Sequence, residues 1–343
     1  MKSCWAALFS SGHSSVKVGR RTFKIVSTLG EGGYSFVYLV RDAATGKEYA
    51  LKQILAQTSE QLEQAKNEID VLRLFNHPNL LGLVDSEAVK TQTGSQINLL
   101  FEAYKEGTLV DLVESSASLH PAVVLNIFLQ VCRGCQCMHL PKTKGGTRYA
   151  HRDIKPHNVL LSSQSEDALD PYHAVLMDFG SARPARVSVT SRSGALKTQE
   201  EAEAHTTATY RSPELFDCPS EFELDERTDV WSLGCLLYYM CYGESPFEYV
   251  LNQAGGSLAL AVISGKMSWG AEGKGYHPLV EDLCRLCLRQ DLGERPFVDQ
   301  VLEEAYRALD AVLEETRRAR KQGKKNQERT QTKGTESAED NQI

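Results

Sequence analysis

The sequence predicts an α+β protein of two lobes, in which strands dominate the first lobe and helices the second. Alternating apolar residues at 36–40 and 49–55, and the apolar run 97–104, predict strands in the first third of the chain. Helical patterns dominate further along, most clearly over 121–140 and 229–242. A small sheet-rich part followed by a larger helical part is therefore expected.

Composition shifts along the chain set the expected domain boundaries. Residues 1–22 are weakly patterned and are expected to form a flexible leader. The folded part then covers 23–315, with the N-terminal lobe over about 23–104 and the C-terminal lobe over about 105–315. Residues 322–343 contain almost no apolar side chains, so a disordered polar tail is predicted there.

Charge and hydropathy exclude two classes of protein. The chain has 343 residues and a net charge of −7, from 38 basic and 45 acidic residues. Nucleic-acid binding usually requires a clustered basic excess, so we expect no nucleic acid as the main partner. No apolar run approaches the ~20 residues that span a bilayer.

The nine cysteines bear on the compartment. The spacing of Cys132 with Cys135, and of Cys284 with Cys287, would suit either zinc ligands or helical core positions. Both pairs lie in apolar, helix-like runs without a close second pair, which favours reduced, partly buried thiols. We therefore predict a reducing, cytoplasmic location.

A glycine-rich stretch, GEGGYSFV at 30–37, lies between two strand patterns. Glycines let a backbone turn approach phosphate oxygens closely, with its N–H groups facing the negative charge. Alone, the stretch could equally be an ordinary hairpin. No GK[ST] follows it, which argues against a P-loop.

Lys52 stands between apolar residues of a predicted strand, 15 residues after Val37. A lysine there loses hydration unless anionic partners replace the water. Glu68, on the predicted helix 59–75, and the phosphates of ATP could be those partners. The alternative is a surface lysine that points away from the sheet.

The run HRDIKPHN at 151–158 places a carboxylate, a cation and an amide close together. Asp153 can accept the proton of an incoming hydroxyl, and Lys155 can offset charge on a transferring phosphoryl group. Asn158, with Asp178 of the later DFG, offers hard oxygen ligands that suit Mg²⁺.

These blocks, in this order and at these separations, resemble the signature set of eukaryotic protein kinases over about residues 23–315. YRSPE at 210–214 resembles the end of an activation segment. DVWSLG at 229–234 and the pair Arg295-Pro296 resemble two further kinase blocks. The resemblance implies a bilobal kinase fold, with an antiparallel sheet plus one helix in the N-lobe and a mainly helical C-lobe.

The resemblance also implies a role for each matching residue, with ATP and Mg²⁺ as cofactors. Asp153 would be the base, Lys155 the phosphate contact, and Asn158 and Asp178 the metal ligands. Lys52 would hold the α and β phosphates. The residues implied to bind the nucleotide are Leu29, Gly30, Glu31, Gly32, Gly33, Tyr34, Ser35, Phe36, Val37, Ala50, Lys52, Glu68, Phe101, Glu102 and Tyr104.

The reaction implied is transfer of the ATP γ-phosphate to Ser/Thr hydroxyls of proteins. Lys155 two residues after Asp153, and Thr207 three residues before Tyr210, resemble Ser/Thr rather than Tyr kinases. The alternatives are a pseudokinase scaffold and a lipid or small-molecule kinase. The pseudokinase scaffold is disfavoured because the residues needed for the reaction are all present: Lys52, Asp153, Asn158 and Asp178. The lipid or small-molecule kinase is disfavoured because the SPE and DVWSLG blocks serve a protein-substrate platform.

Within the kinases, LGEGGYSFVYLV and DERTDVWSLGCLLYYMCYGESPF resemble the Numb-associated kinase family, nearest to its small acylated branch on Golgi and other membranes. That branch carries a glycine for myristate where this chain has Lys2. An acyl chain on Cys4, with Trp5, Leu8 and Phe9 as a second apolar signal, would instead give peripheral membrane contact. The alternative is an unmodified cytosolic leader.

The implied activation segment has two halves of different character. Residues 181–194 are unpatterned and are expected to be mobile, whereas 195–204 are strong helix formers. A short helix packed on the C-lobe is predicted there, with a solvated acidic loop as the alternative. Autophosphorylation is expected at Thr198 or Thr206, and the phosphate could then pair with Arg152.

Overall fold

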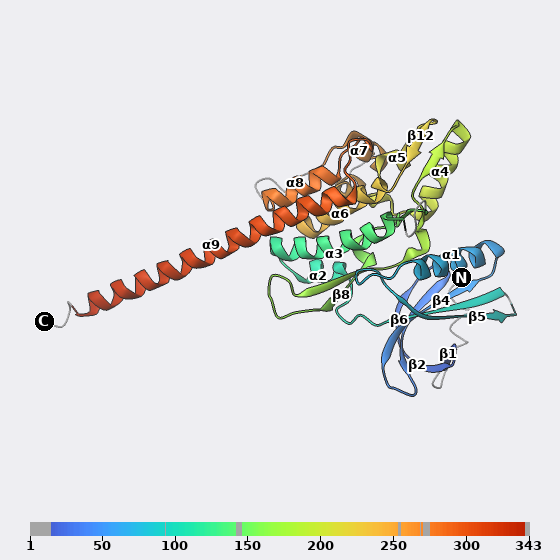
Figure 1. Ribbon diagram of the computed structural model, residues 1–343, viewed down its shortest axis with the longest axis horizontal. Coiled ribbons are helices and arrows are strands. Elements are labelled where there is room, and N and C mark those ends of the chain that lie inside the picture. Colours follow the sequence, from blue (N-terminus) through green and yellow to red (C-terminus); the bar gives the residue numbers. More distant parts are fainter. Residues whose placement is uncertain are drawn as a thin grey trace.

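The computed structural model describes residues 15–92, 94–141, 146–252, 255–267, 269 and 275–339. Two lobes are visible, with the N-terminal strands in one and most helices in the other (Figure 1). The predicted α+β bilobal fold is confirmed.

The N-lobe is one antiparallel sheet with the strand order β1-β2-β3-β4-β6-β5 and a single helix. Alternating side chains point to opposite faces of this sheet, and both faces carry apolar residues: Ile97, Leu99 and Phe101 belong to the main core, and Tyr49, Leu51 and Leu100 to a second cluster. Its elements are β1 (Ser15–Val18), β2 (Arg21–Glu31), β3 (Ser35–Asp42), β4 (Glu48–Ala56), α1 (Ser59–Leu74), β5 (Leu83–Thr91) and β6 (Gly94–Glu102).

Helix α1 begins where the sequence provides a capping box. The Thr58 side chain accepts a hydrogen bond from the backbone N–H of Gln61, and the Gln61 side chain accepts one from the backbone of Thr58. The helix then buries Ala65 and Leu72 together with one carboxylate, Glu68. This burial directs Glu68 toward the sheet and the cleft.

The C-lobe is built around α3 and α6, which contact each other and carry most of the core. Its helices are α2 (Leu109–Ser115), α3 (Pro121–His139), α4 (Arg192–His205), α5 (Pro213–Phe216), α6 (Arg227–Tyr242), α7 (Leu258–Ser264), α8 (Pro278–Cys287) and α9 (Val298–Glu339). Short strands and 3-10 turns complete it: β7 (Tyr149–Ala150), η2 (Pro156–Asn158), β8 (Val159–Ser163), β9 (Tyr172–Leu176), η3 (Phe179–Ser181), β10 (Arg183–Pro184), β11 (Val187–Val189), η4 (Ala208–Tyr210), β12 (Phe222–Leu224) and η5 (Glu248–Asn252).

Helix α3 is apolar on nearly every face because it lies inside the lobe. Among the described helices it is the one with the length and composition to cross a membrane, but 72% of that stretch is buried in protein. Cys132 on α3 and Cys284 on α8 are buried free thiols, as the helical spacing predicted. Burial raises the pKa of both thiols, so each stays a neutral apolar group.

The prediction of a flexible leader over residues 1–22 is wrong for residues 15–22. Residues 15–22 enter the sheet, because β1 pairs antiparallel with β2 through a tight turn at Gly19, whose φ is +59°. The side chain of Val18 is fully buried beside Phe23. Only two apolar residues of β1 carry this pairing, too short a pattern to stand out in the sequence. Residues 1–14, which include Cys4, lie outside the described part.

The expected mobility of 181–194 is also corrected. β10 pairs with β7, and β11 pairs with β12 far along the chain. Val189 is buried against Ala195 and Cys218. These partners are distant in sequence, so local patterning could not reveal the strands.

The helix predicted at 195–204 is confirmed as α4, which is longer by a turn. Ser191 caps this helix, since the Ser191 side chain accepts a hydrogen bond from the backbone N–H of Gly194. Thr198 lies inside the helix with a buried side chain, and its hydroxyl donates to the carbonyl oxygen of Gly194 at 3.0 Å.

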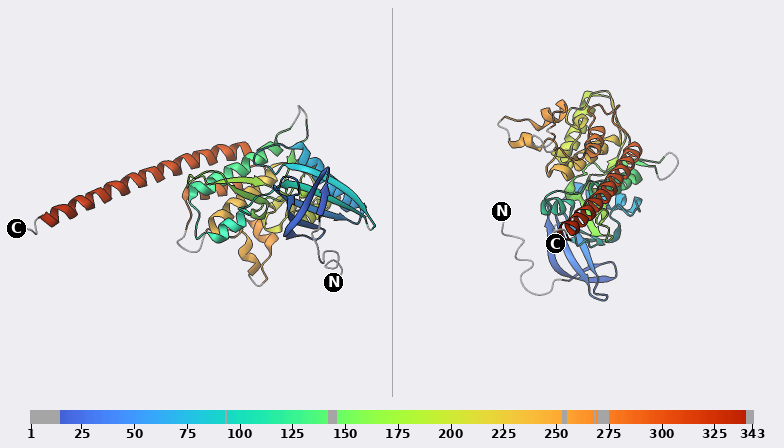
Figure 2. Two further views of the ribbon diagram at one scale, coloured as in Figure 1. Left: turned by 90° about the horizontal axis from the view of Figure 1, so that it is seen from below. Right: turned by 90° about the vertical axis from the view of Figure 1, so that its left-hand side faces the viewer.

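The last helix differs from the expected tail. α9 packs against α3 and then leaves the body of the molecule as a long rod (Figures 1 and 2). It continues to Glu339, through most of the predicted disordered segment 322–343. Lys, Gln, Glu and Arg favour helix even without an apolar stripe, so a helix anchored by packing can propagate through them.

Candidate active site

A cavity of about 530 Å³ lies between the two lobes. Its walls come from β2, β3 and β4 above and from β8 and the segment after β9 below. Residues predicted to bind the nucleotide supply most of this lining: Leu29, Gly30, Glu31, Gly32, Ser35, Val37, Ala50, Lys52, Glu68, Phe101, Glu102 and Tyr104. The apolar walls suit a flat aromatic base, and Lys52 supplies a cation in the same cavity.

Three predicted residues of the glycine-rich stretch lie elsewhere. Gly33, Tyr34 and Phe36 are not part of the cavity lining. The Tyr34 side chain is 60% exposed at the strand turn, and Phe36 stacks on Tyr38 with ring centroids 6.2 Å apart. Alternation along β3 sends Val37 to the cavity and its neighbour Phe36 to the other face.

Several lining residues were missed by the sequence reasoning. Leu160 on β8 and Met177 before the DFG form the lower wall, and Asp111 lies at the mouth. The remaining missed residues are Leu72, Leu81, Gly107, Thr108 and Phe179. Leu160 is an ordinary apolar strand position and Met177 directly follows the apolar strand β9, so no local signal distinguishes them from core. Asp111 did have a local signal, because Thr108 followed three residues later by Asp111 is the pattern of a helix capping box.

Lys52 joins the two lobes at the inner end of the cavity. Its Nζ lies 2.7 Å from Glu68 Oε1 and 3.2 Å from Asp178 Oδ1. Burial alone would lower the pKa of Lys52, but the two carboxylates outweigh burial and raise it. Lys52 is therefore a permanent cation, and the predicted pairing with Glu68 is present.

Backbone strain occurs at two points beside this cavity. Arg152 and Asp178 have φ values of 67° and 66°, a left-handed conformation that non-glycine residues rarely adopt. Asp229 stabilises the left-handed conformation of Arg152, because its carboxylate accepts hydrogen bonds from the backbone N–H groups of His151 and Arg152 at 2.7 and 2.8 Å. His139 Nε2 lies 2.9 Å from the same carboxylate.

Asp153 lies where the catalytic loop meets the activation segment. Its Oδ1 accepts hydrogen bonds from the Thr207 backbone N–H at 3.0 Å and from the Thr207 hydroxyl at 2.7 Å. Its Oδ2 lies 2.9 Å from Lys155 Nζ, and that amine also donates to Thr207 at 2.8 Å. The carboxylate is thereby held in one orientation.

Asn158 and Asp178 offer oxygen atoms toward the cavity. The Asn158 amide nitrogen donates to the backbone oxygen of Asp153 at 2.7 Å, and no described residue donates to its Oδ1. The Asp178 side chain is 46% exposed. Burial would raise the pKa of Asp178, but Lys52 outweighs it and lowers the pKa, so the carboxylate stays ionised. Two hard oxygen ligands fit a divalent cation that retains water.

The SPE block is tied to the end of the domain by a buried ion pair. Arg295 donates to both oxygens of Glu214, at 2.8 and 3.0 Å, and its side chain is fully buried. Arg295 also donates to the backbone oxygen of Arg227 at the start of α6. This bidentate contact holds the activation segment against the core.

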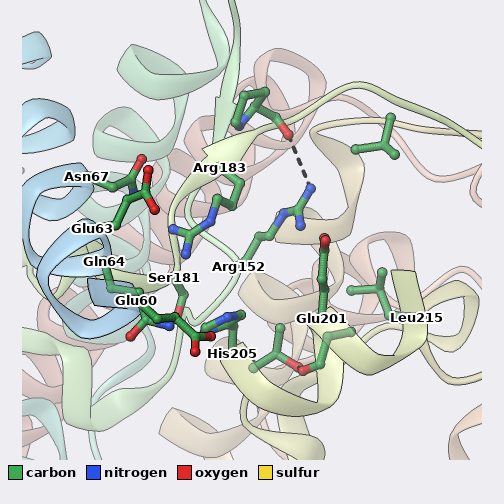
Figure 3. Close-up of a pocket in the computed structure, with 14 residues that line it drawn as sticks. Glu60, Glu63, Gln64, Asn67, Arg152, Ser181, Arg183, Glu201, His205 and Leu215 are labelled. Atoms are coloured by element: carbon green, nitrogen blue, oxygen red, sulfur yellow. Dashed lines mark hydrogen bonds between the residues drawn. The ribbon is translucent and has the colours of Figure 1, made fainter. Parts of the chain in front are cut away.

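A second cavity, of about 560 Å³, lies between α1 and α4. Figure 3 shows Arg152, Arg183 and His205 facing it, with Glu60 of α1 and Glu201 of α4 at its sides. The Arg152 guanidinium donates to the carbonyl oxygen of Pro184 at 3.2 Å and forms no ion pair within the described residues. Phosphate pairing with Arg152 stays a prediction.

The fold and this site together define a protein kinase. The chain belongs to the protein kinase family, whose domain it matches over residues 23–307. It is similar to a probable serine/threonine-protein kinase of Dictyostelium discoideum, with 36% identity over 80% of this chain and 90% of the relative.

Two further relatives agree on the class of acceptor. Serine/threonine-protein kinase 16 of Homo sapiens is 40% identical over 75% of this chain and 81% of that protein. Serine/threonine-protein kinase ENV7 of Saccharomyces cerevisiae is 28% identical, over 84% of this chain and 92% of that protein. The protein is therefore an ATP-binding serine/threonine protein kinase.

Proposed function

We propose that Asp153 is the base of this kinase, acting on Ser/Thr hydroxyls of protein substrates. The observation that carries the proposal is the orientation of its carboxylate. Both oxygens accept hydrogen bonds from the residues that border the acceptor site, Thr207, Lys155 and Asn158. A carboxylate held in this way can orient a hydroxyl and accept its proton as the phosphoryl group transfers.

Two lysines of the site, Lys155 and Lys52, offset the negative charge of the phosphate groups. Lys155, bonded to both Asp153 and Thr207, lies where it offsets negative charge on the transferring group. Lys52 holds the α and β phosphates, and Glu68 fixes the direction of its amine. Burial of the pair in the cavity keeps both side chains from swinging into solvent.

Asn158 and Asp178 are the proposed ligands of Mg²⁺, through Asn158 Oδ1 and the Asp178 carboxylate. Bound there, Mg²⁺ would neutralise phosphate charge in the transition state. The described residues contain no group of three or more His, Cys, Asp or Glu able to hold a metal, which matches a cation that takes few protein ligands.

Replacement of Asp153 by Asn tests the base. Shape and most hydrogen bonding are kept while the proton acceptor is lost, so peptide phosphorylation should fall by about 10²–10⁴-fold. ATP affinity and melting temperature should stay close to wild type. Transfer at a near wild-type rate would show that Asp153 is not the base.

Autophosphorylation of the activation segment is part of the proposal, with Thr206 as the acceptor. The burial of Thr198 within α4 speaks against Thr198. Thr206 is bonded through its hydroxyl to Ala202 and Arg211, at the end of the helix. Mass spectrometry of protein incubated with ATP, compared with Thr206→Ala, would identify the site.

We further propose membership of the Numb-associated kinase family and peripheral membrane contact through Cys4. The glycine-stretch and α6 motifs, and the similarity to serine/threonine-protein kinase 16, support the placement. Fractionation of cells that express wild type or Cys4→Ser tests the membrane part. Equal and wholly soluble behaviour of both proteins would remove acylation at Cys4, and leave a cytoplasmic enzyme.

A further inference from the structure

A third cavity, of about 370 Å³, lies in the C-lobe where the end of α3 meets the start of α9. It is separate from the two cavities described above, because no residue lines more than one of the three. The lining residues that bear on its chemistry come from four parts of the chain: His139, Leu140, Arg148, Arg186, Glu226 and Phe297. A cavity of this size is large enough for a small molecule.

One wall of this cavity holds a buried carboxylate with a free oxygen. Glu226, at the start of α6, has a side chain that is 1% exposed. Its Oε1 accepts a hydrogen bond from Arg148 Nη1 at 2.8 Å, but no described residue hydrogen-bonds its Oε2. Arg186 Nε lies 3.8 Å from Oε2, too far for a hydrogen bond. A buried acceptor without a donor costs free energy, so this oxygen favours a ligand that donates.

His139 provides a second buried acceptor. Its Nε2 lies 2.9 Å from Asp229 Oδ2, and a carboxylate only accepts, so Nε2 carries the hydrogen. Nδ1 of the uncharged ring is then an acceptor, and it has no hydrogen-bond partner in the described part of the chain. Arg148 Nη1 contacts both residues, since it also donates to the backbone oxygen of His139 at 3.2 Å. The two acceptors therefore belong to one neighbourhood.

The same cavity offers a donor and apolar surface. The guanidinium of Arg186, whose side chain is 63% exposed, donates to no described residue. Leu140 and Phe297, both large apolar residues, are 48% and 38% exposed. A ligand therefore meets acceptors, a donor and apolar side chains together, which is the composition of small-molecule sites.

The charges of the lining argue for a neutral ligand. Two arginines, Arg148 and Arg186, and two carboxylates, Glu226 and Asp299, line the cavity, so their charges cancel. A cation would be repelled by the arginines and an anion by the carboxylates. A group that both donates and accepts, without a charge of its own, matches this pattern.

We propose that this cavity, the α3–α9 pocket, binds a small neutral molecule that carries a primary amide on an apolar ring. The amide NH₂ donates to Glu226 Oε2 and His139 Nδ1, and its carbonyl oxygen accepts from Arg186. The exposed Arg186 side chain moves aside to admit the amide, and the ring packs on Leu140 and Phe297. The inference goes beyond the proposed reaction and does not depend on Asp153 being the base.

The position of the pocket connects it to the rest of the enzyme. His139 contacts Asp229, the carboxylate that holds the strained backbone of Arg152. Arg186 belongs to the activation segment, between β10 and β11. A ligand in the α3–α9 pocket therefore contacts the activation segment and the support of the catalytic loop at the same time.

Benzamide is the probe that tests the chemistry, with benzoate and benzylammonium as matched anion and cation. The full chain is first saturated with Mg²⁺ and a non-hydrolysable ATP analogue, so that the probes cannot enter the nucleotide cavity. Saturation-transfer NMR titration should give a Kd for benzamide of about 0.1–1 mM, and binding about tenfold weaker or more for the two charged probes. No saturable binding of benzamide up to about 10 mM, or benzylammonium binding as tightly, would overturn the proposal.

Variants place the binding in the pocket. Glu226→Gln replaces the free carboxylate and should weaken benzamide binding about tenfold or more. Arg186→Met keeps the apolar stem of an exposed side chain and should weaken it about threefold to tenfold, so the test does not depend on the folding of the Glu226 variant. Arg317→Met, at an exposed α9 position, is the control and should bind as wild type does.

A crystal structure with benzamide completes the test. Density for the amide beside Glu226 is expected. Ordered water alone at that place, or unchanged affinity in both pocket variants, would show that the α3–α9 pocket is not a ligand site.

Discussion

At the scale of single residues, conformations that cost free energy are held by charged partners elsewhere in the chain. Arg152 keeps a left-handed φ because the buried Asp229 carboxylate accepts its backbone N–H. Burial would raise the pKa of Asp229, but contacts with His139, His151 and Arg152 lower it. Asp229 thus stays ionised, and it fixes the loop that presents Asp153.

The buried pair Glu214–Arg295 should matter more for stability than any surface pair. Glu214→Gln leaves the fully buried Arg295 guanidinium without a counter-charge, which typically costs about 3–5 kcal/mol in the free energy of unfolding. Glu314→Gln, whose partner Arg318 is 76% exposed, should cost less than about 1 kcal/mol. Urea denaturation of both variants measures the difference. Equal losses would contradict this account.

At the scale of elements, packing stabilises short segments that propensity alone would not keep ordered. α4 has no broad apolar face and is stabilised where Ala195 and Ala202 pack against the C-lobe. A helix of its length would be marginal in water on its own. Its contacts with α5 connect the activation segment to the SPE block.

The helical state of α4 can be tested with two variants that remove the same carboxylate and differ only in whether they allow a helix. Glu201→Pro removes a backbone N–H in the helix interior, which costs about 3 kcal/mol, and should lower peptide phosphorylation at least tenfold. Glu201→Ala removes the same carboxylate but keeps the helix, so it is the matched control. If both variants were equally active, an ordered α4 would not be needed for activity.

The contact between α6 and α8 depends on a glycine. A Cβ at Gly234 would lie 2.8 Å from Cys287 Cβ and 2.8 Å from Leu288 Cγ, closer than van der Waals contact allows. Gly234→Ala should therefore lower the free energy of unfolding by about 1–3 kcal/mol. Gly82→Ala, where nothing lies within 4 Å, is the control, and urea denaturation is the measurement. A Gly234 variant as stable as the Gly82 variant would show that the helices can separate at no cost.

At the scale of the whole molecule, the two lobes enclose the nucleotide cavity, and the outer part of α9 projects away from both (Figure 2). Residues beyond 322 contain too few apolar side chains to add to the core. We therefore expect the two lobes and the part of α9 up to residue 322 to be sufficient for the reaction.

Truncation after Gln322 tests this division. Surface segments without buried apolar area contribute little to stability, so the melting temperature should change by less than about 1 °C. kcat/KM on a peptide substrate should equal that of the full chain. A lower melting temperature or a loss of activity would show that the distal helix contributes to the catalytic body.

Much of the chemistry could be read from the sequence because the reacting residues occur in short contiguous blocks. Asp153, Lys155 and Asn158 fall within six residues, and the structure brings them together with Lys52 and Asp178. Leu160 and Met177 could not be recognised as cavity residues. They differ from core residues only in facing the cleft, and that depends on how the lobes meet.

The sequence by itself determined the class of fold and the order of the blocks, since local patterns and spacing are enough for these, and the resemblance of those blocks to protein kinases implied the Ser/Thr kinase reaction. Only the tertiary structure decided that residues 15–18 and 187–189 are strands, because their partners β2 and β12 have to be in place first. It also gathered Lys52, Glu68 and Asp178 from three separate segments of the chain. Proximity of this kind is produced by packing of the whole chain, and no local pattern records it.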